Sequence, residues 1–65
     1  MTQDQLIDRL RGNIASLEAL LGLMESSQLK VFSNQSDVTA SAVEMYNGII
    51  SNLNQLIDAV GRDPA

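Results

Sequence analysis

Residues 6–24 read LIDRLRGNIASLEALLGLM, and the spacing of the apolar residues in this stretch decides the fold. Apolar side chains recur at alternating steps of three and four residues, the a and d positions of a heptad, which predicts an apolar stripe along one helix. Leu6 and Leu20 stand at the neighbouring g position and widen the stripe on one side. The stripe itself consists of Ile7, Leu10, Ile14, Leu17, Leu21 and Met24.

Residues 42–60, AVEMYNGIISNLNQLIDAV, repeat this design. Two such helices joined by a short polar turn predict an all-α protein, a two-helix antiparallel hairpin. An a/d/g face is wider than one neighbouring helix can cover, so we expect two hairpins to dimerise into a four-helix bundle. The second helix has Val43, Tyr46, Ile50, Leu53, Ile57 and Val60 at a and d, and Ala42, Ile49 and Leu56 at g. The expected dimer and core seam comprises Leu10, Ile14, Leu17, Leu21, Met24, Tyr46, Ile50, Leu53 and Ile57.

Local signals indicate where the first helix begins and ends. Thr2 and Gln5 have the spacing of a capping box, which predicts a start at about residue 3. The Ser26-Ser27 pair offers an early end, whereas the heptad register continues to Val31 and favours an end near Phe32. We expect the longer helix, weakened at the serines.

The second helix has several candidate starts and one clear end. Ser36 or Asp37 is the expected N-cap, and Ser41 opens a second capping box that would give a later start. Gly61 followed by Pro64 is typical of a helix C-terminus. The expected layout of residues 1–65 is one domain with a helix over about 3–32, a turn over about 33–36, a helix over about 37–61 and a short C-terminal tail.

A chain of 65 residues is short for a stable monomer. Domains of this size bury only about 60% of the surface that the unfolded chain exposes. The chain has no Cys for disulfide bonds, and because His is absent too, the usual zinc ligands are missing. Self-association is the remaining common means of stabilisation, so we expect the first partner to be a second copy of the chain.

Composition also restricts the chemistry. The acid-base groups are eight carboxylates, four basic residues and Tyr46, and a hairpin of this size offers no obvious cleft to hold them. We therefore expect no catalytic residue, no cofactor and no enzyme activity. Asp4 and Asp8 lie one turn apart, but two carboxylates alone are a weak cation site, and a solvated helix start is the favoured interpretation.

The chain carries no recognisable targeting or membrane segment. Its N-terminus lacks a basic stretch followed by an apolar one, so we expect no signal peptide. The longest apolar run is far shorter than the roughly 20 residues that a membrane span needs. Together with the absence of Cys, this favours a cytoplasmic location.

Two further sets of residues are candidate contact surfaces. Small residues on the first helix, opposite its leucines, would let another backbone approach closely; the alternative is that they are merely tolerated in an exposed helix. Apolar residues near the turn form an adaptable surface of the kind that binds helices or peptides; the alternative is that they fill the end of the bundle core. The candidate close-packing stripe is Gly12, Ala15, Ala19 and Gly22, and the candidate partner-binding patch is Leu23, Leu29, Phe32, Val38 and Met45.

Nucleic acid is the less favoured partner. The net charge is −4, and Arg9 and Arg11 are followed by Asn13, Ser16 and Glu18 rather than by a basic strip. In length and layout the whole chain resembles the small plasmid-encoded RNA-binding hairpins, which are acidic two-helix dimers. That resemblance implies an RNA-binding modulator as the alternative function.

Taken together, these features favour a homodimeric protein-interaction module. Such a module regulates, inhibits or chaperones an unidentified partner protein by helix-on-helix contact. Small helical hairpins of this type are frequent among phage and bacterial accessory proteins, which is an analogy of size and layout. A purely structural assembly subunit is the third possibility.

Overall fold

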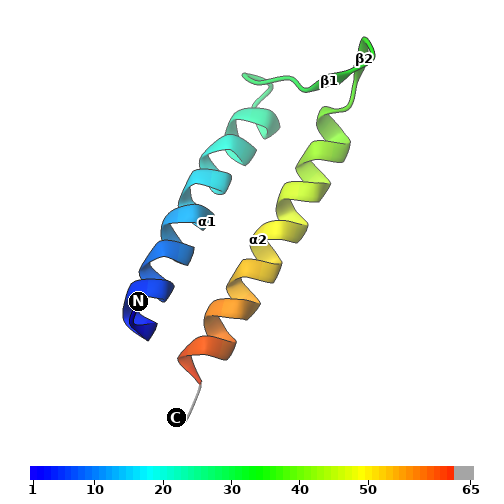
Figure 1. The fold of residues 1–65 in the computed structure, drawn as a ribbon. Coiled ribbons are helices and arrows are strands. Elements are labelled where there is room, and N and C mark those ends of the chain that lie inside the picture. Colours follow the sequence, from blue (N-terminus) through cyan, green and yellow to red (C-terminus); the bar gives the residue numbers. More distant parts are fainter. Residues whose placement is uncertain (63–65) are drawn as a thin grey trace.

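The computed structural model describes residues 1–62 and consists of two helices that lie side by side (Figure 1). Helix α1 spans Gln3–Glu25 and helix α2 spans Thr39–Gly61, each with 23 residues. Between them, strands β1 (Phe32–Ser33) and β2 (Ser36–Asp37) form a minimal antiparallel pair. The predicted two-helix hairpin is therefore confirmed.

Helix α1 begins where the capping box predicts. The Thr2 hydroxyl accepts a hydrogen bond from the Gln5 backbone N–H at 3.1 Å, and the Gln5 side chain accepts one from the Thr2 N–H at 2.8 Å. Asp4 lies in the first turn, where a negative charge suits the positive end of the helix dipole. The predicted start is confirmed.

Helix α1 ends at the serine pair, so the prediction of a helix running to about Phe32 is wrong. Ser27 has a φ of 66°, its N–H donates to the Met24 carbonyl at 3.2 Å, and the Gln28 N–H donates to the Leu23 carbonyl at 2.9 Å. These two bonds form a Schellman motif, which closes a helix around a left-handed residue. The next a position, Gln28, supplies no apolar side chain that would hold a longer helix against α2.

The polar turn predicted at residues 33–36 is the tip of a longer connection. The turn connects β1 to β2 rather than helix to helix. In the resulting strand pair, Phe32 lies opposite Asp37. Asn34 and Gln35 have φ values of 52° and 70°. A two-residue hairpin turn of type I′ needs positive φ at both central positions, which Asn adopts more readily than most residues.

Helix α2 starts later than 37, because β2 contains both predicted cap residues. Ser36 and Asp37 pair with β1, and the helix begins at Thr39 after Val38. Val38 makes no side-chain capping bond; the Asp37 carboxylate instead accepts a hydrogen bond from the Thr39 backbone N–H at 2.9 Å. The alternative start at Ser41 is also wrong.

The end of α2 at Gly61 agrees with the prediction, while Pro64 lies outside the described residues. At this open end of the hairpin, the Gln3 side-chain amide donates a hydrogen bond to the Val60 carbonyl and ties the two helices together. Within residues 1–62, neither helix combines the length and the apolar character needed to cross a membrane.

The core is one row of side chains from α1 that faces α2. Its buried members are only 4–9% exposed, whereas the other residues of the predicted seam are half-buried. Over its whole described length α2 contributes no buried residue. A single hairpin therefore leaves its second helix incompletely covered. The buried residues are Leu10, Ile14, Leu21 and Met24, and the half-buried ones are Leu17, Tyr46, Ile50, Leu53 and Ile57.

Candidate interaction surface

The two broad faces of the hairpin differ in chemistry. In each helix the a and d residues point at the other helix, with g residues along one edge and e residues along the opposite edge. Because the helices run in opposite directions, the two g edges share one face and the two e edges share the other. The two faces can therefore be compared position by position.

The g positions carry no charge, and most of them are apolar. We call this side the apolar face; it consists of Leu6, Leu20, Ile49 and Leu56, with Ala42 and Asn13 at the two remaining g positions. Leu20, Ile49 and Leu56 are 39%, 39% and 46% exposed, and Leu6 is half-buried. Exposed apolar side chains that gather on one face of a small protein often mark an interaction surface.

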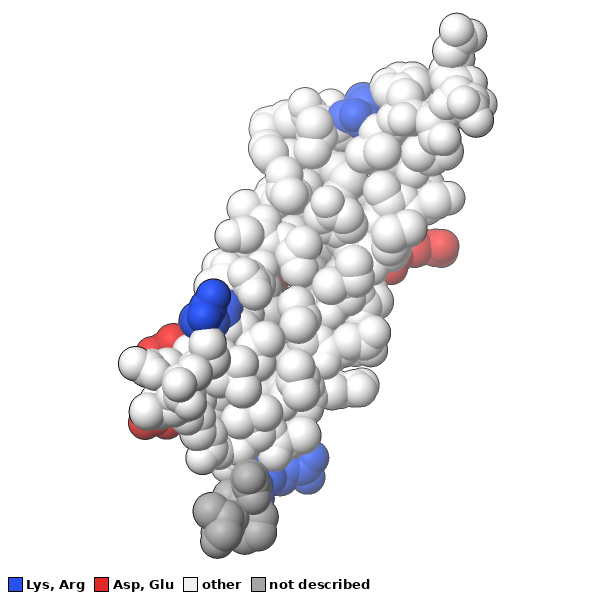
Figure 2. All heavy atoms as spheres, in the orientation of Figure 1, with Lys and Arg blue, Asp and Glu red and all other residues white. Residues whose placement is uncertain are grey.

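The e side is polar. Every e position of α1 is charged and exposed, and those of α2 carry small or amide side chains that are also exposed. The opposite g side is the broad face shown in Figure 2, on which charged side chains lie along the edges and at the ends and leave the middle largely uncharged. The e residues are Asp4, Arg11, Glu18 and Glu25 in α1, and Ala40, Asn47, Asn54 and Gly61 in α2.

The predicted partner-binding patch lies at the turn end of the molecule and is largely exposed. Leu23 and Met45, both at c positions beside the g edge, are 40% and 63% exposed. Phe32 in β1 is 61% exposed, Leu29 is 36% exposed, and Val38 is half-buried. Leu23, Phe32 and Met45 are therefore not buried in the single hairpin. We refer to these five residues as the turn-end patch.

The connection between the helices, which carries Leu29, Phe32 and Val38 of the turn-end patch, is held by its own hydrogen bonds. The Val38 N–H donates to the Val31 carbonyl at 2.8 Å, and the Val31 N–H donates to the Thr39 hydroxyl at 2.9 Å. That hydroxyl donates in turn to the Asp37 carboxylate at 2.6 Å, and the Lys30 ammonium lies 3.9 Å from the same carboxylate. The patch is thus presented on an ordered scaffold, which reduces the entropy lost on binding.

Hydrogen bonds from Thr39 also fix the charge on this scaffold. The pKa of the Asp37 carboxyl lies below the ordinary value. The hydrogen bond from the Thr39 hydroxyl lowers it most, the bond from the Thr39 backbone N–H comes next, and the positive charge of Lys30 adds to the effect. Asp37 is therefore ionised at neutral pH and is a poor proton donor.

The small-residue stripe makes no close contact with the rest of residues 1–62. Gly12, Ala15, Ala19 and Gly22 are all exposed, and a Cβ added at either glycine would meet nothing within 4 Å. The alternative interpretation, that these residues are tolerated on an exposed helix face, is sufficient for the single hairpin.

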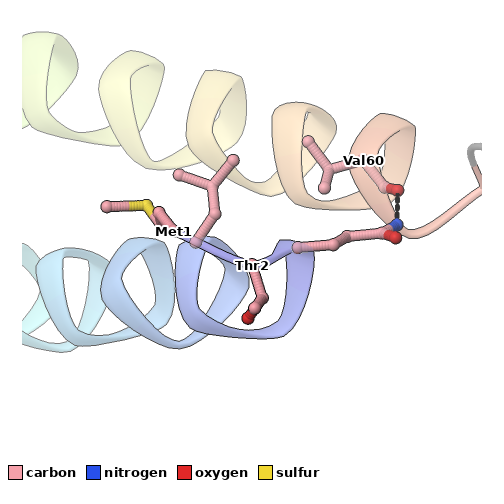
Figure 3. Close-up of a pocket in the computed structure, with 5 residues that line it drawn as sticks. Met1, Thr2 and Val60 are labelled. Atoms are coloured by element: carbon pink, nitrogen blue, oxygen red, sulfur yellow. Dashed lines mark hydrogen bonds between the residues drawn. The ribbon is translucent and has the colours of Figure 1, made fainter.

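A shallow hollow of about 360 Å³ lies at the open end of the hairpin (Figure 3). It lies between the start of α1 and the end of α2, with Met1, Leu6 and Val60 as its apolar lining and Thr2 and Gln3 as its polar lining. The side chains that line it carry no carboxylate, ammonium or guanidinium group. Within residues 1–62, no three acidic side chains come together to hold a metal ion.

The chain was compared with family models, curated proteins and solved structures, and none of the three comparisons gives a match.

Proposed function

We propose that this protein is a homodimeric interaction module that regulates, inhibits or chaperones a partner protein by helix-on-helix contact. Two hairpins pack through their apolar faces into a four-helix bundle, and the turn-end patch binds the partner. The module acts in the cytoplasm, and the lack of Cys fits a reducing compartment.

The contrast between the two faces carries the proposal. Self-association through the g side covers Leu20, Ile49 and Leu56 and buries no charged g residue; the charge nearest this edge is that of Arg9, an exposed residue at a c position. Burial of a charge without a partner is costly, so the charged e side is the wrong surface for a symmetric contact. A second copy would also cover the half-buried residues of α2.

The dimensions of the hairpin suit this role. Its long and intermediate extents are 49 and 18 Å, which gives one broad face a projected area of roughly 900 Å². Stable protein interfaces bury about 800 Å² on each partner. One face of the hairpin is therefore large enough for a dimer without any further segment.

Matched variants on the two edges of α2 test the dimer. Leu56→Asp puts a carboxylate on the apolar face, and Asn54→Asp puts the same charge on the polar face. Both positions are exposed in the single hairpin, so neither change is expected to disrupt its core. Sedimentation equilibrium is expected to show a dimer for Asn54→Asp and a monomer or unfolded chain for Leu56→Asp. Dimerisation that survives Leu56→Asp would refute the proposed interface.

A second pair of variants tests where the partner binds. Leu23→Ser with Met45→Ser is compared with Arg9→Ala with Arg11→Ala, after each pair is checked for an unchanged melting curve and oligomeric state. We expect the serine variant to lose a co-purifying protein and the alanine variant to keep it. The reason is that the partner's helix would bind the turn-end patch through apolar contacts, which the serines remove and the alanines leave intact. Salt-sensitive loss of a bound RNA in the alanine variant alone would favour the RNA-binding modulator.

A further inference from the structure

We propose that the second copy on the apolar face lies antiparallel to the first, so that the turn end of each hairpin packs beside the open end of the other. This inference rests on the proposed homodimer and adds its geometry. Two symmetric arrangements can join the same faces. In the antiparallel one, the two-fold axis crosses the rod at its middle; in the parallel one, it runs along the rod.

Asn13 distinguishes the two arrangements. It is the one polar residue among the six g positions, and it lies one residue before the midpoint of α1, as Ile49 does in α2. In the antiparallel dimer, α1 faces α1 of the other copy, so Asn13 meets its own symmetry mate and Ile49 meets its own. In the parallel dimer, α1 faces α2 of the other copy, and each Asn13 meets an Ile49.

The amide of Asn can satisfy itself only against another polar group. An Asn side chain has both a carbonyl acceptor and an NH2 donor, so two symmetry-related Asn13 side chains can hydrogen-bond to each other. Against Ile49 the same amide would be buried without a partner, on both sides of the dimer. A lone polar residue in an otherwise apolar interface is a known means of selecting one helix arrangement over another.

The remaining apolar side chains also find apolar neighbours in the antiparallel dimer. At about 1.5 Å of rise per residue, Leu6 falls near the level of Leu20 of the second copy, which is also a g residue. Leu56 falls near the level of Ala42 of the second copy, again a g residue. The apolar face is thus covered along its length.

Charge favours the same orientation. Over residues 14–50, the turn half, one Lys stands against four carboxylates; over residues 1–13 and 51–62, three Arg stand against three Asp. The parallel dimer places two acidic turn halves against each other. The antiparallel dimer places each acidic turn half beside the other half of the second copy, whose charges over residues 1–13 and 51–62 cancel. Repulsion between the copies is then smaller at the short distances over which salt does not screen charges.

This arrangement has a consequence for partner binding. The two turn-end patches lie at opposite ends of the dimer, separated by roughly the 49 Å length of one hairpin. Each dimer therefore offers two separate sites, and two partner molecules bind without contact between them.

The absence of native Cys allows a direct test with the full chain. The single variants Asn13→Cys and Ile49→Cys are oxidised mildly, alone and as a mixture, and covalent dimers are separated on a denaturing gel. In the antiparallel dimer the Cα atoms of symmetry-related residues 13 lie about 6 Å apart, within the range of a disulfide. Leu20→Cys on the same face is the control, since its mates lie about 18 Å apart.

We expect each of the variants Asn13→Cys and Ile49→Cys to cross-link to itself, and Leu20→Cys to remain monomeric on the gel. Cross-linking only in the mixture of the two variants would establish the parallel dimer and overturn the inference, while leaving the homodimer intact. If no variant cross-links, sedimentation of the reduced variants shows whether they are dimers or monomers. A dimer that gives no cross-link refutes the antiparallel geometry, and a monomer refutes the proposed homodimer itself.

Discussion

Replacing Ser27 by Gly is expected to stabilise the protein, although Gly is a poor helix residue. Ser27 adopts a φ of 66° in the Schellman motif that ends α1. This left-handed conformation costs a residue with a Cβ about 1–2 kcal/mol and suits Gly. The greater freedom of Gly in the unfolded chain offsets up to about 1 kcal/mol of that gain. The net expectation is an increase of about 0.5–1 kcal/mol in the free energy of unfolding per chain.

Urea unfolding at a fixed chain concentration measures this change, because the stability of a dimer depends on concentration. Ser26→Gly is the matched control. Ser26 has an ordinary φ of −87° and its hydroxyl donates to the Leu23 carbonyl at 3.2 Å, so Gly at this position should destabilise the protein. If Ser27→Gly destabilised the protein as much as Ser26→Gly does, the helix would continue through the serines and the Schellman end would be wrong.

Three further outcomes follow from the structure. Gly12→Ala is expected to raise the free energy of unfolding by up to about 1 kcal/mol in a urea titration, because the added Cβ meets nothing within 4 Å; dissociation of the variant would show that the small-residue stripe is an interface. Leu53→Asp, at a half-buried core position, should unfold the protein as followed by circular dichroism, whereas exposed Ser51→Asp should change stability by less than about 0.5 kcal/mol; equal effects would mean that the helix register is wrong. Hydrogen bonds from Thr39 lower the pKa of Asp37, so the stability that they provide is complete above the ordinary value of 3.8 and is lost as the pH falls toward the lower folded-state value; an acid-unfolding curve unchanged by Asp37→Asn would contradict this.

The helices were predictable because their signals repeat. Six a and d positions in each segment give the same period, and the capping box at Thr2 adds an independent mark for the start of α1. The end of α1 depends instead on one local competition. A Gln at the next a position gives little burial to a longer helix, and a serine in the left-handed region replaces the glycine that would have announced the Schellman motif.

The connection between the helices was harder to predict because it too depends on local conformation and carries no repeated signal. Its strands have two residues each, too short for an alternating pattern, and Asn34 was the only residue that suggested a turn with positive φ. Pairing of β1 with β2 then placed Asp37 before the helix rather than at its cap.

For the interaction surface, the sequence predicts which residues are apolar but not which are accessible. Heptad spacing places Leu23 and Met45 beside the core, and this position fits either a buried bundle end or an exposed patch. Their exposed fractions of 40% and 63% depend on how the helices and the connection are placed, which periodicity does not specify.

The dependence of thermal unfolding on chain concentration tests most directly whether the apolar face is a dimer interface. For a dimer that unfolds to separated chains, a hundredfold increase in concentration adds about 2.7 kcal/mol to the stability of the folded state. With the unfolding entropy typical of two such chains, this raises the melting temperature by on the order of 10 °C. We expect a rise of this size, with sedimentation equilibrium showing a dimer over the same range. A folded monomer whose melting temperature is independent of concentration would contradict it.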